Sequence, residues 1–311
     1  MDEISKTNRE RWNTLAQVNV EWSRPYLEYT PQQAAENIYR HGVIQDVQAK
    51  RVLCLASGGG QDSVAFAMLG ADVTVYDLSD EQLQRDRLAC AHHGLPVRTL
   101  QGDMRDLSAF QDGEFDIVWQ VYSINFVPSI QPVIAGVARI LKPGGLYFLQ
   151  FANPFTIAVD EERWNGDSYP LKHPYLDGEN ITAYFPHWDV TQPDGSKVQV
   201  DSPHEFRHNL GTLLNALVGV GFILLGLWEF QESSQNPAPG TWNHFLQVAP
   251  PWFSQCPRRP RVCKGRRCRL VARTAAVRSG HSPFPFERRS IGRLVRRPNP
   301  ASAKSSCVDL Q

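Results

Sequence analysis

The residues best suited to bind a ligand form a glycine-rich turn, Ser57-Gly58-Gly59-Gly60, which follows the apolar run 52–55. Glycine lets the backbone approach a ligand closely and take positive φ angles. Residues 61–69 then carry apolar side chains at helical spacing, and the N-terminus of a helix presents unpaired N–H groups. The stretch predicts a buried strand, a ligand-binding loop and a helix, although an ordinary strand-to-helix turn has the same pattern.

A carboxylate at the end of the next apolar run favours the ligand-binding interpretation. The run 73–76 ends in Asp77, 19 residues after Gly58. An acidic side chain at the tip of a second parallel strand can accept hydrogen bonds from both ribose hydroxyls of a nucleoside. A dinucleotide fingerprint would place a third glycine three residues after Gly60, where Ser63 stands. The pattern therefore fits a pyrophosphate-binding loop only imperfectly.

Strands and helices alternate from Arg51 onward, after an N-terminal helical lead over residues 1–50 that includes a helix from Pro31 with Thr30 as its N-cap. The predicted strands cover 51–56, 72–77, 96–100, 114–121 and 146–151. The predicted helices between them cover 61–69, 79–92 and 131–141. This alternation predicts an α/β fold with a doubly wound parallel sheet, whose ligands bind beyond the carboxyl ends of the strands.

The region after the fifth strand departs from this alternation. Residues 152–202 are rich in aromatic side chains and are interpreted as an insertion. A helix over 203–220, a sixth strand over 221–228 and a seventh over 242–248 are predicted to follow. Because a short connection joins the last two strands, we expect them to form an antiparallel pair.

The composition changes sharply at residue 254. The chain has 311 residues and a formal net charge of zero, yet residues 254–311 hold 15 of the 32 Lys and Arg and only 2 of the 32 Asp and Glu. On composition alone we predict a domain boundary here, with a folded domain over 51–253 and a basic, unstructured tail over 254–311. The tail is either a genuine part of the protein or the product of a frameshift, because a frameshift would also give an Arg- and Pro-rich sequence. Its cysteines lack the spacing of a zinc site, so no metal is expected.

Length and composition also limit the location and partners of the chain. A hydrophobic fraction of 42% is typical of a globular core. The sequence has no apolar run of about 18 residues and its start lacks the apolar region of a signal peptide, which predicts a cytoplasmic protein without a membrane span. We do not expect a nucleic-acid partner, because no aromatic stacking platform accompanies the basic tail.

With the strands placed, residues 51–155 resemble the class I S-adenosylmethionine-dependent methyltransferases. The matching motifs, in order, are Leu55–Gly60, Asp77-Leu78-Ser79, Gly102-Asp103-Met104, Phe115–Val118 and Ala138–Gly145. The resemblance implies a Rossmann-like seven-stranded sheet, with the seventh strand inserted antiparallel to its neighbours. It also implies S-adenosylmethionine as the cofactor and methyl transfer as the reaction.

The same resemblance implies roles for individual residues. Those expected to contact the cofactor are Ala56, Ser57, Gly58 and Gly60 at the methionine part, Asp77 at the ribose hydroxyls, Leu78 and Met104 on the adenine ring, Asp103 at the adenine amino group, and Gln120 near the methionyl group and the acceptor. Cys54 and Ala56 stand where the family often has an acidic residue and a glycine.

The methyl acceptor is predicted to be a small molecule, because the insertion is aromatic and not basic. A planar or lipophilic compound, such as a phenol or a quinone precursor, suits such a lid. His173, His187 and His204 are candidate bases, but none is assigned and the catalytic residues are left unknown. Two alternatives remain open at this point: a non-catalytic nucleoside-binding protein on the same fold, and a nicotinamide-dependent oxidoreductase.

Overall fold

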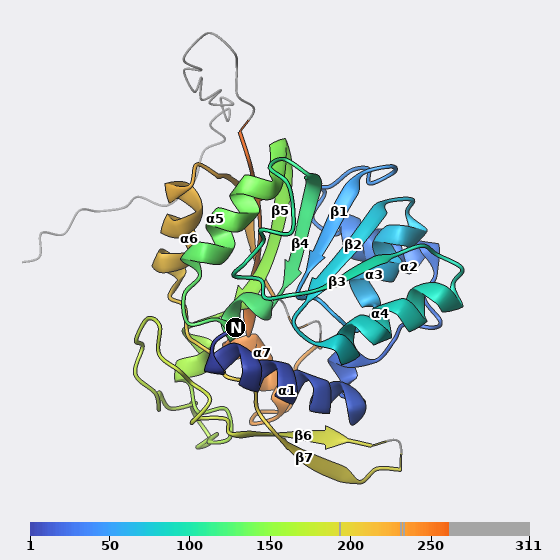
Figure 1. Cartoon of the computed structure of the whole chain (residues 1–311). Coiled ribbons are helices and arrows are strands. Elements are labelled where there is room, and N and C mark those ends of the chain that lie inside the picture. The colour runs from blue at the N-terminus through green and yellow to red at the C-terminus, as the bar shows by residue number, and fades with distance from the viewer. Residues whose placement is uncertain (193, 231, 233, 261–311) are drawn as a thin grey trace, which may run out of the picture. The chain divides into compact units, whose positions relative to one another are not determined.

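Five strands from the first half of the chain form the parallel part of a seven-stranded sheet (Figure 1). The computed structural model describes residues 1–192, 194–230, 232 and 234–260. The five strands are β1 (Arg51–Leu55), β2 (Asp72–Asp77), β3 (Arg98–Gln101), β4 (Phe115–Val121) and β5 (Leu141–Ala152). Each agrees with a predicted strand, although β5 begins five residues earlier than residue 146.

The strand order is β3-β2-β1-β4-β5-β9-β8, so β1 lies at the point where the order reverses. Leu53 of β1 pairs in parallel with Thr74 of β2 on one side and with Val118 of β4 on the other. Ligands of open parallel sheets bind beyond the carboxyl ends of the strands at such a switch point. The fold therefore places the glycine-rich turn after β1 where a ligand is expected.

The last two strands are β8 (Ile223–Glu229) and β9 (Trp252–Arg258), and β9 runs antiparallel to both of its neighbours. Ser254 of β9 pairs with Gln150 of β5 and with Trp228 of β8. The prediction of a seven-stranded, Rossmann-like sheet with an antiparallel last pair is confirmed.

The position of the seventh strand was predicted wrongly. Residues 242–248 form a helix, α7 (Trp242–Val248), whose N-cap Thr241 accepts a hydrogen bond from the His244 amide. Phe245 and Leu246 bury one face of this helix with Val159, so a short apolar run has helical and not strand periodicity.

The seventh strand lies across the predicted boundary at residue 254. Ser254, Gln255 and Cys256 are buried in β9 between β5 and β8, so the assignment of these residues to an unstructured tail is wrong. The sequence here lacks the alternation of apolar and polar residues that indicates a strand, because both faces of β9 are covered. The remaining predictions for the tail fall on residues 261–311, which lie outside the described residues.

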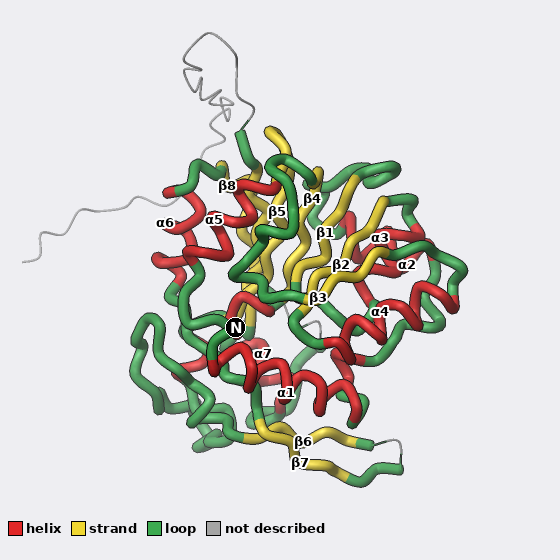
Figure 2. The backbone as a smooth tube through the Cα atoms, in the orientation of Figure 1, coloured by secondary structure: helices red, strands yellow, loops and turns green. Residues whose placement is uncertain are grey.

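Helices cover both faces of the sheet (Figure 2). On one face α5 (Gln131–Ile140) and α6 (Leu210–Gly219) pack on the odd-numbered residues of β1 and on β5. On the other face α2 (Pro31–Tyr39), α3 (Gln61–Met68) and α4 (Asp80–His92) pack on the even-numbered residues of β1 and on β2. Thr30 and Pro31 begin α2 as predicted, through a capping box with Gln33.

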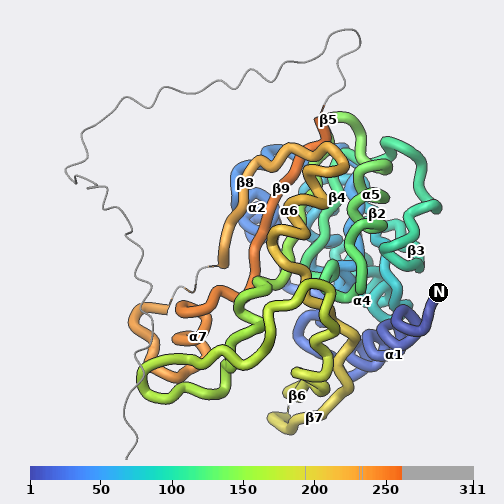
Figure 3. Tube along the Cα trace, turned by 90° about the vertical axis from the view of Figure 1, so that its left-hand side faces the viewer, coloured from blue at the N-terminus to red at the C-terminus, as the bar shows by residue number. Residues whose placement is uncertain are grey.

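The carboxyl edge of the sheet is covered by the N-terminal lead and by the insertion (Figures 1 and 3). The covering elements are α1 (Glu3–Gln17), the short helices η1 (Glu21–Ser23) and η3 (Thr156–Ala158), and the hairpin of β6 (His187–Thr191) and β7 (Lys197–Asp201). Trp188 of β6 contacts Trp12 and Trp22 edge to face, with ring centroids 5.7 and 5.5 Å apart. The two covering segments therefore pack on each other.

The connection into α6 also differs from the prediction of a helix over 203–220. The helix begins at Leu210, and Asn209 is its N-cap. Residues before it are extended because their backbone is paired elsewhere: the Phe206 amide donates to the Asn125 carbonyl, and the Arg207 amide to the Glu179 carbonyl. Among the described residues, no helix is long and apolar enough to cross a membrane.

A chain that ends after Phe253 is expected to be at least about 3 kcal/mol less stable than a chain that ends after Pro260. The shorter chain lacks Cys256, which is 1% exposed, and the pairing of residues 254–258 of β9 with β5 and β8. Burial of each large apolar side chain contributes ~1.5–3 kcal/mol. Urea unfolding measures the difference, and equal unfolding midpoints would show that the sheet does not depend on β9 beyond Phe253.

Candidate active site

The turn after β1 requires glycine at three successive positions for different reasons. Gly59 and Gly60 have φ angles of +106° and +87°, and Gly60 is the N-cap of α3. Gly58 has an ordinary φ, but a Cβ there would lie 2.4 Å from Gln82 Cβ of α4. Ala56 also takes a positive φ, of 48°. The turn is thus a tight backbone cradle, as the sequence predicts.

Asp77 lies against this cradle at the carboxyl end of β2. Its Oδ2 accepts a hydrogen bond from the Gly58 amide at 3.3 Å, and its Oδ1 accepts one from the Ser79 amide at 2.8 Å. Burial raises the pKa of Asp77 to about 6, although these amide hydrogen bonds oppose the rise. A carboxylate offers about four acceptor positions, so Asp77 retains capacity for ligand hydroxyls. Leu78 follows it and is half-buried.

Asp103, after β3, has its carboxylate held by other residues. Ser5 Oγ of α1 donates to Asp103 Oδ2 at 2.6 Å, and Arg105 Nη2 lies 2.6 Å from the same oxygen. Arg105 also forms an ion pair with Asp2 at 2.8 Å. Burial alone would raise the pKa of Asp103, but the hydrogen bonds from Arg105 and Ser5 hold that pKa below its ordinary value.

Gln120 and Met104 meet beneath these loops. Gln120 Nε2 lies 3.3 Å from Met104 Sδ and 3.0 Å from Ser123 Oγ. The Tyr147 hydroxyl donates to Gln120 Oε1 at 2.5 Å. Gln120 is fully buried, and its amide therefore fixes the loop after β3 to β4 and β5.

The structure thus brings together the predicted residues after β1 and β2, and it places Met104 on Gln120. Sequence reasoning missed the N-terminal segment that joins these loops. We call residues 2–24, which comprise α1 and η1, the strap. The strap contacts the loop after β3 through Ser5, the loop after β2 through Asn13, which accepts from Ser79 Oγ at 2.6 Å, and the glycine turn through Trp22.

The contact of the strap with the glycine turn is close. Gln61 Nε2 donates to the Trp22 carbonyl at 2.9 Å, and a Cβ on Gly59 would lie 2.6 Å from that carbonyl oxygen. In the structure Trp12 packs, whereas the Trp22 side chain is 61% exposed. The polar contacts of the strap give no periodic signal in the sequence.

Two buried carboxyl groups lie behind the glycine turn, and neither was singled out from the sequence. Ser63 Oγ donates to Asp86 Oδ1 at 2.5 Å, and Asp86 Oδ2 has no hydrogen-bond partner among the described residues. Burial raises the pKa of Asp86 to about 8 and that of Asp62 to about 6. Burial also raises the pKa of Cys54, and both carboxyl groups add to that shift. Asp62, which has the lower pKa of the two, thus brings a carboxylate near Cys54, where the family often has an acidic residue.

The three candidate histidines have structural partners. His187 Nδ1 lies 3.1 Å from Asp201 Oδ1 across the β6–β7 hairpin. His204 Nδ1 lies 3.4 Å from Asn180 Nδ2, and the His204 backbone amide donates to Asn8 Oδ1 at 2.6 Å. The His173 ring stacks on Tyr184 with centroids 3.8 Å apart. None of these contacts identifies a base.

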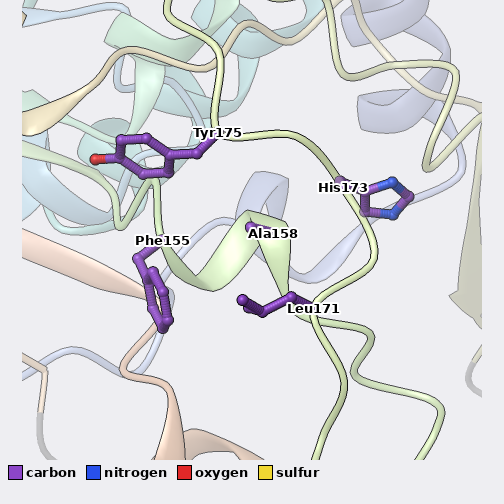
Figure 4. Close-up of a pocket in the computed structure, with 5 residues that line it drawn as sticks. All are labelled: Phe155, Ala158, Leu171, His173 and Tyr175. Carbon is purple, nitrogen blue, oxygen red and sulfur yellow. The ribbon is translucent and has the colours of Figure 1, made fainter. Parts of the chain in front are cut away.

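An apolar cavity of about 340 Å³ lies in the insertion, just after the carboxyl end of β5 (Figure 4). Its lining residues are Phe155, Ala158, Leu171, His173 and Tyr175. In Figure 4 the Phe155 and Leu171 side chains lie near Ala158, whereas the His173 ring points away from them. Phe155 and Leu171 are 53% and 66% exposed, so the cavity is open to solvent.

Comparison with known proteins relates this site to an established family. The model of the family described as a methyltransferase domain matches residues 53–149. The chain is 31% identical over 241 residues to the uncharacterized methyltransferase YbaJ of Bacillus subtilis, and this match covers 74% of the chain and 91% of that protein.

Two further similarities are more limited. The ubiquinone biosynthesis O-methyltransferase of Bordetella avium is 32% identical over 154 residues, which cover 48% of the chain and 62% of that enzyme. The crystal structure of the [4+2]-cyclase SpnF superposes with a TM-score of 0.55 at 16% identity, covering 83% of the chain and 97% of that structure. The second similarity shows the fold alone.

Asp86→Asn is expected to flatten the dependence of stability on pH. Because the folded-state pKa of about 8 lies above the ordinary 3.8, the folded chain binds the Asp86 proton more tightly than the unfolded chain does. Stability from this group is therefore complete at low pH and is lost as the pH rises through about 8. Thermal unfolding between pH 5 and pH 9 should show a smaller loss of Tm in the variant.

Asp80→Asn, at the exposed start of the same helix, is the matched control for this measurement. A wild-type pH slope in Asp86→Asn would show that the buried carboxyl group is not protonated in the folded chain.

Proposed function

The chain belongs to the class I S-adenosylmethionine-dependent methyltransferases, and on that premise we propose that it methylates a small, largely apolar molecule. S-adenosylmethionine is the cofactor and methyl transfer is the reaction. The observation that carries the acceptor proposal is the cavity lined by Phe155, Leu171 and Tyr175, which opens next to the carboxyl edge of the sheet.

The residues around the glycine turn fit the cofactor. Gly58 leaves a space that a Cβ would fill, with Asp77 Oδ2 only 3.2 Å from that position. The buried Ser57 hydroxyl faces the Cys54 thiol and has no other polar partner among the described residues. In our proposal Ala56, Ser57, Gly58 and Gly60 hold the methionine part, with Asp77 on the ribose hydroxyls.

The remaining predicted contacts belong to the same proposal. Leu78 and Met104 flank the adenine ring, Asp103 lies at the adenine amino group, and Gln120 fixes the floor of the site. Arg105 and Ser5 both donate hydrogen bonds to the Asp103 carboxylate. Asp103 can therefore bind the adenine amino group only if these side chains share the carboxylate with it or move away. The strap contacts each of these loops and covers the nucleoside part of the site.

When bound, S-adenosylmethionine supplies a methyl group already activated by its sulfonium. The chain must hold the acceptor in line with that methyl group and exclude water, since alignment supplies much of the rate enhancement in such transfers. The strap and the insertion cover the carboxyl edge from opposite directions and pack on each other through Trp12 and Trp188. They are suited to keep water from the transfer.

The acceptor cavity lies on the same side of the sheet as the glycine turn. β1 and β5 flank β4, and their carboxyl ends lead into the glycine turn and into the segment that lines the cavity. An apolar cavity with few polar groups suits a planar or lipophilic compound such as a phenol or a quinone precursor. The name of the Bordetella relative, an O-methyltransferase of ubiquinone biosynthesis, supports this class.

Two finer predictions accompany this proposal: a cytoplasmic location and a small-molecule rather than a nucleic-acid substrate.

The direct test of the proposed acceptor is an assay of the purified chain with methyl-labelled S-adenosylmethionine against phenols, catechols and hydroxylated quinone precursors. Transfer to at least one of these compounds is expected. Transfer to protein or RNA alone would contradict the proposed acceptor.

Asp77→Asn is expected to weaken S-adenosylmethionine binding by about tenfold to hundredfold, because the loss of a carboxylate acceptor to ligand hydroxyls costs ~1–3 kcal/mol. The wild-type affinity should also fall below pH about 6, where Asp77 becomes protonated. Isothermal titration calorimetry from pH 5 to pH 8 measures both effects.

Asp72→Asn, at the opposite and exposed end of β2, is the matched control and should bind within about twofold of wild type. Equal affinities of the Asp77→Asn and wild-type chains would contradict the placement of the ribose at Asp77.

Replacement of the exposed cavity residues Phe155 and Leu171 by serine is expected to raise the KM for an apolar acceptor by about tenfold each. Each change removes apolar contact area, and an apolar group in a pocket is worth roughly 1–3 kcal/mol. Leu88→Ser, a similarly exposed leucine on α4, is the control. An unchanged KM in both cavity variants would place the acceptor elsewhere.

A further inference from the structure

The first residue after β4 has an unusual backbone conformation. Tyr122 takes a φ of +60°, which is rare for a bulky side chain. Its amide donates to the Gln150 carbonyl of β5 at 2.9 Å, and its carbonyl accepts from Asn125 Nδ2 at 2.7 Å. These bonds hold the strained residue in one orientation. Strain of this kind concentrates at functional sites.

The Tyr122 side chain is directed at a glutamate that lies far along the sequence. Its hydroxyl donates a hydrogen bond to Glu205 Oε1 at 2.8 Å. Both residues are half-buried, so they are not sealed in the core. Glu205 lies in the extended connection that precedes α6, which the sequence had predicted to be helical.

The backbone of Glu205 is fixed on both sides. Its amide donates to Thr182 Oγ1 at 3.0 Å, and its carbonyl accepts from the Ile181 amide at 2.8 Å. The next amide, of Phe206, donates to the Asn125 carbonyl at 2.7 Å. Asn125 therefore connects the backbone of Tyr122 with the segment that carries Glu205, and the relative position of the two side chains is set by the fold.

The sheet places this pair between the two halves of the proposed site. β4 lies between β1, which leads into the glycine turn, and β5, which leads into the cavity. Tyr122 is the first residue beyond the carboxyl end of β4. With the cofactor at the glycine turn and the acceptor in the cavity, as proposed above, a group at this position lies between the two.

The charges around the pair leave Glu205 able to accept a proton. Burial raises the pKa of Glu205 to about 7, and the hydrogen bond from Tyr122 opposes this rise. The other titratable group that acts on Tyr122 is Glu161 of the insertion, which is also negative when ionised. Within the described ranges, no lysine, arginine or histidine forms a salt bridge with Glu205.

A second tyrosine–glutamate contact shows what a structural pair looks like here. The Tyr184 hydroxyl donates to Glu179 Oε1, but Glu179 also forms an ion pair with the buried Arg207 at 3.1 Å. A carboxylate paired with a guanidinium stays ionised and is a poor base. Glu205 lacks such a partner.

From this geometry we infer that Glu205 is the general base of the methyl transfer and that the Tyr122 hydroxyl conducts the acceptor's proton to it. The inference rests on the proposed function, with a phenolic acceptor. The acceptor O–H bond breaks as its proton passes to the Tyr122 oxygen, while the Tyr122 proton passes to Glu205 Oε1. The acceptor oxygen forms the new bond to the methyl carbon, and the electron pair of the broken carbon–sulfur bond remains on sulfur. Glu205 then loses its proton to solvent.

The test uses the full chain with catechol as the acceptor probe. The wild-type kcat should rise with pH through about 7 as Glu205 ionises, and Glu205→Gln should lower kcat at pH 7 by about 100-fold or more. In that variant kcat should rise only at higher pH, where catechol itself ionises. Binding of S-adenosylmethionine should stay within about twofold of wild type.

A second readout does not depend on catalysis. Carbon-13 NMR of glutamate-labelled chain, with Glu205→Gln to assign the signal, measures the titration of Glu205 directly. Tyr122→Phe should raise the pKa of Glu205, because the hydrogen bond that favours the carboxylate is lost. It should also lower kcat. Tyr184→Phe removes the comparable phenol of the structural pair and should change neither quantity.

The outcomes separate the two proposals. A Glu205→Gln chain that keeps the wild-type kcat and pH profile, or a Glu205 signal that titrates near pH 4, would overturn the assignment of the base. A wild-type chain that binds S-adenosylmethionine but methylates neither catechol nor any other phenol would overturn the proposed acceptor, and the base for that acceptor with it.

Discussion

The hydrogen bond between the Gly58 amide and the Asp77 carboxylate is the contact on which the site depends. It joins the ends of β1 and β2, and it exists because Gly58 has no side chain to separate its backbone from α4 and Asp77. A buried carboxylate without a cation is costly unless amides satisfy it, and Gly58 and Ser79 supply them. In our proposal, ligand hydroxyls that occupy the other acceptor positions relieve the cost that remains.

The elements outside the central sheet act on this same edge. The strap contacts the loops after β1, β2 and β3, and the insertion contributes the cavity after β5. The segment that leads into α6 brings Glu205 to the end of β4. These three parts of the chain thus meet at the carboxyl ends of five parallel strands, which is where the topology of the sheet leaves an opening.

The sequence predicted the parallel strands, the glycine turn and Asp77 because each is encoded locally, in apolar runs and in residues with special backbone freedom. It failed for α7 and β9, since a seven-residue apolar helix and a strand buried on both faces lack a distinctive period. It also missed Arg105, Asp86 and the Tyr122–Glu205 pair. Tyr122 and Glu205, for example, are 83 residues apart in the sequence. Such pairings arise only from tertiary structure. Met104 and Gln120 were each singled out through the resemblance alone, and their contact with each other appears only in the structure.

The central claim is that the cofactor lies between the glycine turn and Asp77, beneath the strap. Amide hydrogen exchange of the full chain, with and without S-adenosylhomocysteine, tests this most directly. We expect added protection at residues 57–61, at 77–79 and along the strap, with no change at the exposed hairpin residues 194–199. Protection confined to other segments, or none at residues 57–61 when the ligand is bound, would contradict the account.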